Sequence, residues 1–507
     1  MEAGETNESL SMDQPHIMDG LPPELFWKIF MINTERGNEP LTLTDSDSDH
    51  RLDTARRCSQ VCRLWRTLLL QFSSIWGRLL HIQNFERTTD TWRVIVASRI
   101  GDASLCITGY VTDSTRPFIF AILQEKWRNV QELEIKDDNL YDEEVLPTWS
   151  FLGREAPKLE AFELWADIYH TNPSRIFPFS PLFGNTAPRL KIFKLWEPFQ
   201  FSLPTPWMAN LHSVAFVGPL NGPLILSALK CMPSLRELYV SGNSLQPMFR
   251  GEDNDLDKLH LPLLESLIID DFYNPMDMIL LLESITLSPE QRPLLQTLFI
   301  PEVDETFPDH QRVHRAVTKW IHAYTSASPP RHLALSDCDQ ILTLADIRNV
   351  DAGEAMRVDL FLDNNQSHVT IEEIVASLRY SVVEELDVFF MDSPPTWPLR
   401  PLFEALQSVT RLTAVGYYIE PLFHDMLQFS LFPDLHTIDL LGPETDGGAT
   451  IIPTVIQFLE HRVLTGSPLF VLDLSSFDSA ALSDTNKEHL DKIPGLSVIL
   501  PGDYSGW

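Results

Sequence analysis

The sequence feature that most constrains the fold is a short apolar pattern, Leu-x-x-Leu-x-Leu, which recurs from about residue 100 onward. In an extended strand, alternate side chains point to opposite faces, so the fourth and sixth positions of each copy face the same way. Each copy therefore leaves an apolar edge that only a neighbouring copy can cover, and stacking is expected. Clear copies begin at Val130, Leu159, Leu190, Leu211, Leu235, Leu264, Leu295, Val383, Leu435 and Leu469, and weaker ones include Leu360, Val409 and Leu496.

The segments between the copies favour helices. Thr370-Ile371-Glu372-Glu373 is a capping box, in which the first and last side chains satisfy free backbone N–H groups at a helix start. One strand and one helix per unit resembles a leucine-rich repeat, although the Asn that usually follows the strand occurs only at Asn243. The resemblance implies an irregular leucine-rich-repeat-like solenoid over residues 101–500. A doubly wound α/β domain is the alternative, because it also alternates strands with helices.

A compact helical region is predicted before the repeats. Pro23 and Glu24 suit the first turn of a helix, and Leu25, Phe26, Ile29 and Phe30 then follow helical spacing. A second apolar stripe predicts a helix over 58–69, carrying Cys58, Val61, Cys62, Trp65, Leu68 and Leu69. A third short helix carries Ile75, Trp76, Leu79 and Leu80, and Ser73 or Ser74 is its expected cap.

These residues resemble the F-box motif, in the form seen in fungal-type F-box proteins. The segments that carry the resemblance are Leu21-Pro22-Pro23-Glu24-Leu25, Ile29-Phe30, Val61-Cys62-Arg63-Leu64-Trp65-Arg66 and Ile75-Trp76. The resemblance implies docking onto the Skp-type adaptor of a cullin–RING ubiquitin ligase. The residues it assigns to the adaptor-binding surface or its immediate support are Leu21, Pro22, Leu25, Ile29, Phe30, Val61, Cys62 and Trp65. The same stripes would also close a private helical core, which is the competing interpretation.

The predicted organisation is therefore α/β, with a small N-terminal three-helix F-box module followed by the solenoid. The expected boundaries are a disordered acidic leader (1–19), the module with an acidic loop insertion around 40–52 (20–80), a helical linker (81–100), the solenoid (101–500) and a tail (501–507). Within the solenoid, side chains beside the inward leucines line the face that would hold a client protein. The candidate client-binding residues are Glu163, Trp165, Lys194, Trp196, Tyr239 and Phe299. Four of them are aromatic, and Trp and Tyr are among the residue types that contribute most to interface energies.

Charge and motifs narrow the function. A net charge of −33 argues against a nucleic-acid partner, since phosphate binding depends on Lys and Arg. Residues 51–99 are an exception, with nine arginines against three acidic residues. Five scattered cysteines fit a reducing compartment, so a cytoplasmic or nuclear protein is expected, and no apolar run is long enough for a membrane span. The acidic stretches 45–49 and 253–257 lack the Gly and Glu of a calcium loop, and no catalytic motif, metal site or cofactor site is found.

The predicted function is the substrate-recognition subunit of an SCF-type ubiquitin ligase. Such a subunit binds the Skp-type adaptor, and through it a cullin scaffold, and holds an unidentified protein client. It is not expected to be an enzyme itself. Two alternatives stay open: a non-degradative F-box scaffold protein, and a solenoid enzyme whose site carries no recognised motif.

Overall fold

The computed structural model describes residues 22–32, 51–140, 145–165, 181–196, 205–217, 221–242, 248–249, 258–270, 275–286, 294–300, 310–338, 341–347, 356–361, 382–390, 399–416, 419–441, 448–477 and 482–501. The chain divides into two compact units, one of Met1–Asn172 and Pro178–Ile192, the other of Pro173–Phe177 and Phe193–Trp507. Some predicted features lie outside the described residues: the leader (1–19), Leu21, the loop over 40–50, the stretch 253–257, the capping box (370–373) and residues 502–507.

The first unit begins with four described helices: α1 (Pro23–Ile32), α2 (Arg51–Val61), α3 (Arg63–Gln71) and α4 (Ser73–Arg78). Their shared core contains Phe26, Phe30, Ala55, Leu68, Leu69, Ile75 and Leu79. The prediction of one helix over 58–69 is wrong. Cys62 has an extended backbone (φ −155°, ψ 170°) that separates α2 from α3, and its Sγ accepts a hydrogen bond from the backbone N–H of Trp65 at 3.4 Å.

Two smaller corrections concern the ends of these helices. The residue that precedes α4 is Phe72, which makes no side-chain cap hydrogen bond, so the predicted serine cap is absent. Helix α2 begins at Arg51, so the last two residues of the predicted acidic loop are helical.

A parallel sheet follows the helices within the same unit. Strands β1 (Leu80–His81), β2 (Leu105–Tyr110), β3 (Val130–Lys136) and β4 (Ala161–Trp165) pair in chain order. Their connections are α5 (Asp90–Ile100), α6 (Arg116–Lys126) and the 3-10 helices η2 (Ile82–Phe85), η3 (Trp127–Asn129) and η4 (Leu146–Gly153), and η6 (Leu182–Asn185) follows β4. Buried Leu133 stands in register with Ile107 and Phe162, so one face of the sheet forms an apolar row.

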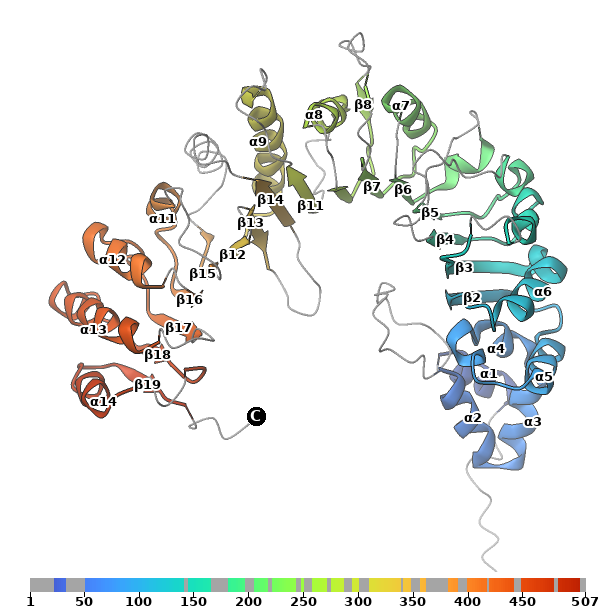
Figure 1. Ribbon diagram of the computed structural model, residues 1–507, viewed down its shortest axis with the longest axis horizontal. Coiled ribbons are helices and arrows are strands. Elements are labelled where there is room, and N and C mark those ends of the chain that lie inside the picture. The colour runs from blue at the N-terminus through green and yellow to red at the C-terminus, as the bar shows by residue number, and fades with distance from the viewer. Residues whose placement is uncertain are drawn as a thin grey trace, which may run out of the picture. The chain divides into compact units, whose positions relative to one another are not determined.

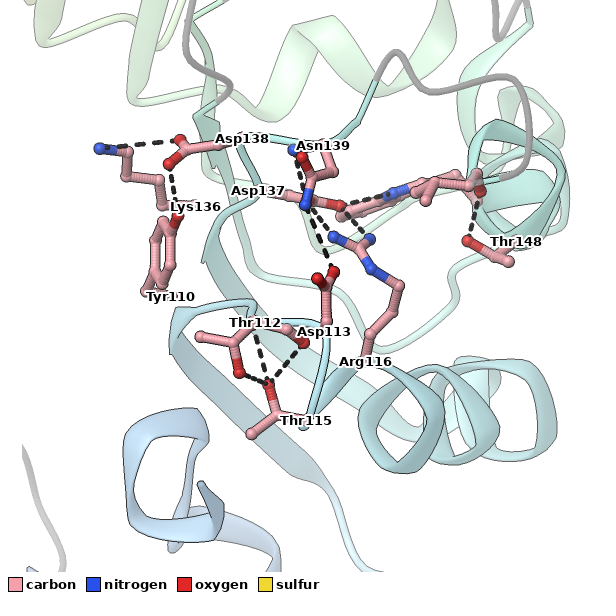
Figure 2. A network of polar contacts seen from close by, with 12 residues as sticks. Tyr110, Thr112, Asp113, Thr115, Arg116, Lys136, Asp137, Asp138, Asn139 and Thr148 are labelled. Carbon is pink, nitrogen blue, oxygen red and sulfur yellow. Dashed lines mark hydrogen bonds and ion pairs between the residues drawn. The ribbon is translucent and has the colours of Figure 1, made fainter. Parts of the chain in front are cut away.

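The ends of β2 and β3 are joined by a polar network (Figure 2). Asp137, which follows β3 and is fully buried, accepts hydrogen bonds from both Nη atoms of Arg116 on α6, at 2.7 and 2.6 Å. The indole N–H of Trp149 and the backbone N–H of Asn139 also donate to it, each at 3.1 Å. One buried carboxylate thus ties α6 and η4 to the end of strand β3.

In the second unit, the strands after β5 (Ile192–Leu195) continue the parallel pairing. Strands β6 (Ser213–Val217), β7 (Glu237–Ser241), β9 (Ser266–Asp270) and β11 (Leu294–Ile300) pair in that order, and β8 (Leu259–His260) pairs with β10 (Ile285–Thr286). The intervening helices are η7 (Pro206–Asn210), α7 (Gly222–Lys230) and α8 (Pro275–Ser284). Helix α7 is capped by Asn221, whose side-chain oxygen accepts from the N–H of Leu224 at 3.0 Å.

The pairing changes after α9 (His310–Ala327). Strands β12 (His332–Cys338), β13 (Ile341–Asp346) and β14 (Met356–Phe361) pair antiparallel, and β14, not β12, lies beside β11. Strand β12 then pairs with β15 (Glu385–Phe390), and parallel pairing continues through β16 (Arg411–Gly416), β17 (Thr437–Leu441), β18 (Val471–Asp473) and β19 (Ser497–Ile499).

The remaining helices of the second unit are α11 (Arg400–Ala405), α12 (Ile419–Phe429), α13 (Gly448–Leu464) and α14 (Asp484–Asp491). In Figure 1, α11, α12 and α13 lie on one side of strands β15 to β18. That side is the core: Leu386, Leu412, Ile438 and Leu472 are buried and stand in register on adjacent strands.

The predicted fold class, a small N-terminal three-helix module followed by an irregular leucine-rich-repeat-like solenoid, is wrong. The described residues form an α/β arrangement with large, mainly parallel β-sheets. The N-terminal helices are not a separate module, because β1 follows α4 within two residues and pairs with β2 in the same compact unit. The strands are not one uniform array either, because the antiparallel β12–β14 segment interrupts the parallel order. The apolar copies predict where strands form, but pairing partners depend on the chain between them.

Candidate functional site

Helix α1 carries apolar side chains on two faces. Phe26 and Phe30, one turn apart, are 1% and 2% exposed and stack with ring centroids 6.4 Å apart. Leu25, Ile29 and Ile32, also spaced one turn apart, are 42%, 40% and 65% exposed. A helix that packs on only one side needs one apolar stripe, so packing among the described residues does not account for the second stripe.

Trp65 completes the core on which α1 rests. Its ring meets Phe26 and Phe30 edge-on, at centroid distances of 6.0 and 5.2 Å. Phe30 and Trp65, both predicted adaptor-binding residues, therefore support the surface from beneath and do not form it.

The junction of α2 and α3 exposes further apolar groups. Val61, the last residue of α2, is 60% exposed, and Leu64, in the first turn of α3, is 41% exposed. Cys62 and Pro22 are also exposed. We refer to Leu25, Ile29, Ile32, Val61 and Leu64 as the exposed apolar residues of α1–α3. Isolated exposed leucines are ordinary on protein surfaces, but five on three short consecutive helices are typical of a binding surface.

Ile32 and Leu64 were not among the residues predicted from the sequence. The signal for Ile32 was present, since every residue of α1 except Pro23, Glu24 and Lys28 is a large apolar one. A helix that is apolar all round must be covered on more than one side. Leu64 carried no such signal, because its exposure depends on the break at Cys62.

Four arginines accompany these apolar residues on the same helices. Arg56 and Arg57 on α2 and Arg63 and Arg66 on α3 are exposed, and their side chains make no ion pair with any described residue. Uncompensated guanidinium groups in a chain of net charge −33 favour association with an acidic surface.

The predicted client-binding residues are held by local contacts. In the first unit, Trp165 Nε1 donates to Glu163 Oε1 at 2.8 Å, and Trp165 stands in register with Lys136. In the second unit, Trp196 meets Tyr239 edge-on at a centroid distance of 4.6 Å, and the Tyr239 hydroxyl donates to Asp270 Oδ2 at 3.3 Å.

Five of the six client candidates have a described side chain, and each of these five is only partly exposed. Glu163, Trp165, Lys194, Trp196 and Tyr239 are half-buried, and the side chain of Phe299, on β11, lies outside the described part of the chain. Trp196 contacts Tyr239 in the second unit, and Trp165 contacts Glu163 in the first. The two pairs lie in separate compact units, so each is a separate candidate surface.

The described residues hold no group of three or more His, Cys, Asp or Glu placed to bind a metal ion. Each helix in the described part of the chain is too short or too polar to cross a lipid bilayer. Burial raises the pKa of the Cys106 thiol to about 12, an effect strengthened by nearby Glu132, so this cysteine is not activated as a nucleophile.

A comparison of the chain with models of known protein families finds no match, and neither does a comparison with curated proteins.

Proposed function

We propose that this protein is the substrate-recognition subunit of an SCF-type, cullin–RING ubiquitin ligase. In this proposal, α1, α2 and α3 bind the Skp-type adaptor, and half-buried aromatic residues on the strands hold a client protein. The observation that carries the proposal is the second apolar stripe of α1, Leu25, Ile29 and Ile32, exposed beside a core that Phe26 and Phe30 already fill.

The apolar contribution to such an interface is comparable to the cost of association. Burying large apolar side chains contributes on the order of 1–2 kcal/mol each when they start half exposed, against an association cost of about 4–15 kcal/mol. The five exposed apolar residues of α1–α3 therefore reach the range of that cost but do not exceed it by much. The exposed arginines of α2 and α3 supply the rest if the partner surface is acidic, through long-range attraction and charge-assisted hydrogen bonds.

The mechanism would be proximity. Holding a client lysine near the activated ubiquitin raises its effective concentration, and no side chain of this chain takes part in bond making. The complex would act in the cytoplasm or the nucleus, where cullin-based ligases are found.

A pull-down with a purified Skp-type adaptor tests the proposal. The Leu25→Asp/Ile29→Asp variant introduces two charges into the exposed stripe and is expected to weaken adaptor binding at least about tenfold, because a carboxylate buried at an interface has no partner. Val94→Asp on α5 is the matched control, since Val94 is 67% exposed in the same unit. Adaptor retention by the stripe variant equal to that of wild type would refute the proposal.

Degradation is tested separately from adaptor binding. Clients are first captured by proximity labelling with the full chain, and their abundance is then followed after the cullin is inactivated. A recognition subunit requires that captured clients accumulate. Constant client levels would indicate a scaffold that binds the adaptor without directing ubiquitination.

A further inference from the structure

Strands β15, β16, β17 and β18 have two unlike faces. Helices α11, α12 and α13 lie on one side of these strands, where they cover the core (Figure 1). Along each strand, buried side chains alternate with half-buried or exposed ones, because successive residues point to opposite faces of a sheet. The side chains that are not buried therefore share the face opposite these helices, which we call the open face.

Three carboxylates lie in one row across the open face. Asp387 on β15 and Asp439 on β17 flank Thr413 of β16 in register, and Asp473 on β18 is in register with Asp439. Adjacent strands are about 4.8 Å apart, so this acidic row is about 14 Å long. Glu385, two residues before Asp387 on β15, adds a fourth carboxylate to the same face.

Two of the four carboxylates are paired closely with a cation. His332 Nε2, at the start of the neighbouring strand β12, lies 2.7 Å from Asp387 Oδ2. Arg411 Nη2 lies 2.7 Å from Asp439 Oδ2. Arg411 is the only Lys or Arg of strands β15 to β18, so it and His332 are the cations that these described strands offer to the open face.

The other two carboxylates leave the open face acidic. Asp473 Oδ1 accepts a hydrogen bond from the backbone N–H of Ser475 at 2.8 Å, and its carboxylate forms no ion pair with a described residue. Glu385 is 46% exposed and lies 3.6 Å from His332, which already contacts Asp387. Four carboxylates thus share two cationic side chains, and two negative charges stay unbalanced.

An apolar row runs beside the acidic row. Phe389, Val415 and Leu441 stand in register on β15, β16 and β17, two residues beyond the carboxylates. All three are half-buried, whereas Val388 and Leu440, which point to the core, are each 1% exposed. The open face therefore presents an acidic row and an apolar row, about 7 Å apart along the strands.

These two rows restrict which kind of segment can bind. An extended segment turns only every second side chain toward a sheet, in a single line, so it would match one row and not both. An amphipathic helix presents two adjacent lines of side chains, because residues three and four apart are neighbours on its surface. The unbalanced carboxylates favour lysine or arginine in one line, and the apolar row favours large apolar residues in the other.

We propose that the open face of β15–β18 binds an amphipathic helix of a partner protein, with lysine or arginine in one line and large apolar residues in the next. The basic line lies over the acidic row, and the apolar line lies over the apolar row. Assigning this helix to the client of a ubiquitin ligase rests on the proposed function. The binding itself does not, because it involves no residue of α1–α3.

Fluorescence anisotropy with the full-length protein tests the open face with three labelled peptides of equal length and net charge. The first carries lysines and leucines in adjacent lines of a helix, the second has the same composition in scrambled order, and the third has glutamine in place of each leucine. The first peptide is expected to bind at least about tenfold more tightly than either of the others, because it alone matches both rows.

The Glu385→Gln/Asp473→Asn variant removes the two unbalanced charges and keeps the two close ion pairs of the open face. It is expected to lose at least about tenfold in affinity for the first peptide. Asp484→Asn/Glu488→Gln on α14 removes the same charge at another exposed site and is the matched control, for which wild-type affinity is expected.

The proposal is overturned if the first peptide does not bind, if the scrambled or glutamine peptide binds equally well, or if the open-face variant and the control behave alike. The Leu25→Asp/Ile29→Asp variant separates this result from the adaptor proposal. It is expected to bind the first peptide as wild type does, whatever its effect on adaptor binding.

Discussion

The Asp137 carboxylate is held in place by hydrogen bonds from several parts of the chain. Its carboxylate is fully buried and receives four donors, from Arg116, Trp149 and the backbone of Asn139. A buried charge is tolerated only when it is paired and its lone pairs are satisfied, and both conditions hold here. Around it, the Tyr110 hydroxyl donates to Asp138 and the Thr115 hydroxyl accepts from the N–H of Thr112 (Figure 2).

Removing the Asp137 carboxylate should therefore be costly. Asp137→Ala leaves the Arg116 guanidinium buried without its partner, and we expect a loss of about 3–5 kcal/mol in the free energy of unfolding, measured by urea denaturation. Glu155→Ala is the control, because its pair with Arg128 is exposed and contributes about 1 kcal/mol or less. Equal losses in the two variants would contradict this account.

His332, at the start of β12, is one residue through which the stability of the fold is expected to depend on pH. Its Nε2 lies 2.7 Å from Asp387 Oδ2 and its Nδ1 lies 3.6 Å from Glu385. The hydrogen bond to Asp387 raises the pKa of His332, while burial and the nearby Arg411 oppose this rise. Folding therefore favours the protonated imidazole, so the pair stabilises the protein below the unfolded pKa of about 6.5 and loses its effect as pH rises through the folded pKa.

We expect His332→Asn to lower the free energy of unfolding most at about pH 5.5 and least at about pH 8.5. Urea denaturation of wild type and variant across this range measures the difference. His489→Asn, at an exposed position on α14, is the comparison. A difference for His332→Asn that is constant with pH, or that grows toward alkaline pH, would rule out the ion pair as its source.

At the scale of elements, α1 shows how one helix divides its apolar residues between core and surface. Leu25 and Ile29 were predicted to share a stripe with Phe26 and Phe30, but the structure turns the two pairs in different directions. The spacing permits both arrangements, because neighbouring residues are about 100° apart on a helix. Only the position of α3 and Trp65 decides which pair is covered.

This division predicts unequal effects on the free energy of unfolding from substitutions on the two faces of α1. Phe30→Ala should cost about 3–5 kcal/mol, since it leaves a cavity beneath Trp65, whereas Leu25→Ala should change stability by about 0.5 kcal/mol or less. Thermal and urea unfolding of both variants provide the measurement. Similar losses for the two would mean that Leu25 is also covered by this chain, which would remove the support for adaptor binding.

At the scale of the whole molecule, charge is distributed unevenly. Nine arginines lie between residues 51 and 99, and another basic group lies on α9, while the net charge is −33. Arg56, Arg57, Arg63 and Arg66 of the first region lie on the same helices as the exposed apolar residues of α1–α3, and the second region includes Arg312, which pairs with Glu283. Each is a local exception to an acidic chain, and the first adds positive charge to the surface that we propose for adaptor binding.

The positions of many strands could be predicted from the local pattern of apolar residues. The clear Leu-x-x-Leu-x-Leu copies from Val130 to Leu469 each coincide with a strand, because alternation of apolar residues is a property of the strand itself. Strands β12 and β13 carry no copy and were missed. Their antiparallel pairing depends on the short connection between Cys338 and Ile341, which no apolar period reveals.

The sequence by itself determined the strand positions, the buried leucines within them and the helical character of the N-terminal region, since these depend on residues a few positions apart. The tertiary structure alone decided that the helices share a unit with β1–β4, that Cys62 breaks a helix, and that Phe30 and Trp65 are core while Ile32 and Leu64 are exposed. Burial is a property of contacts between distant segments, and an apolar residue carries the same signal whether its own chain or a partner covers it.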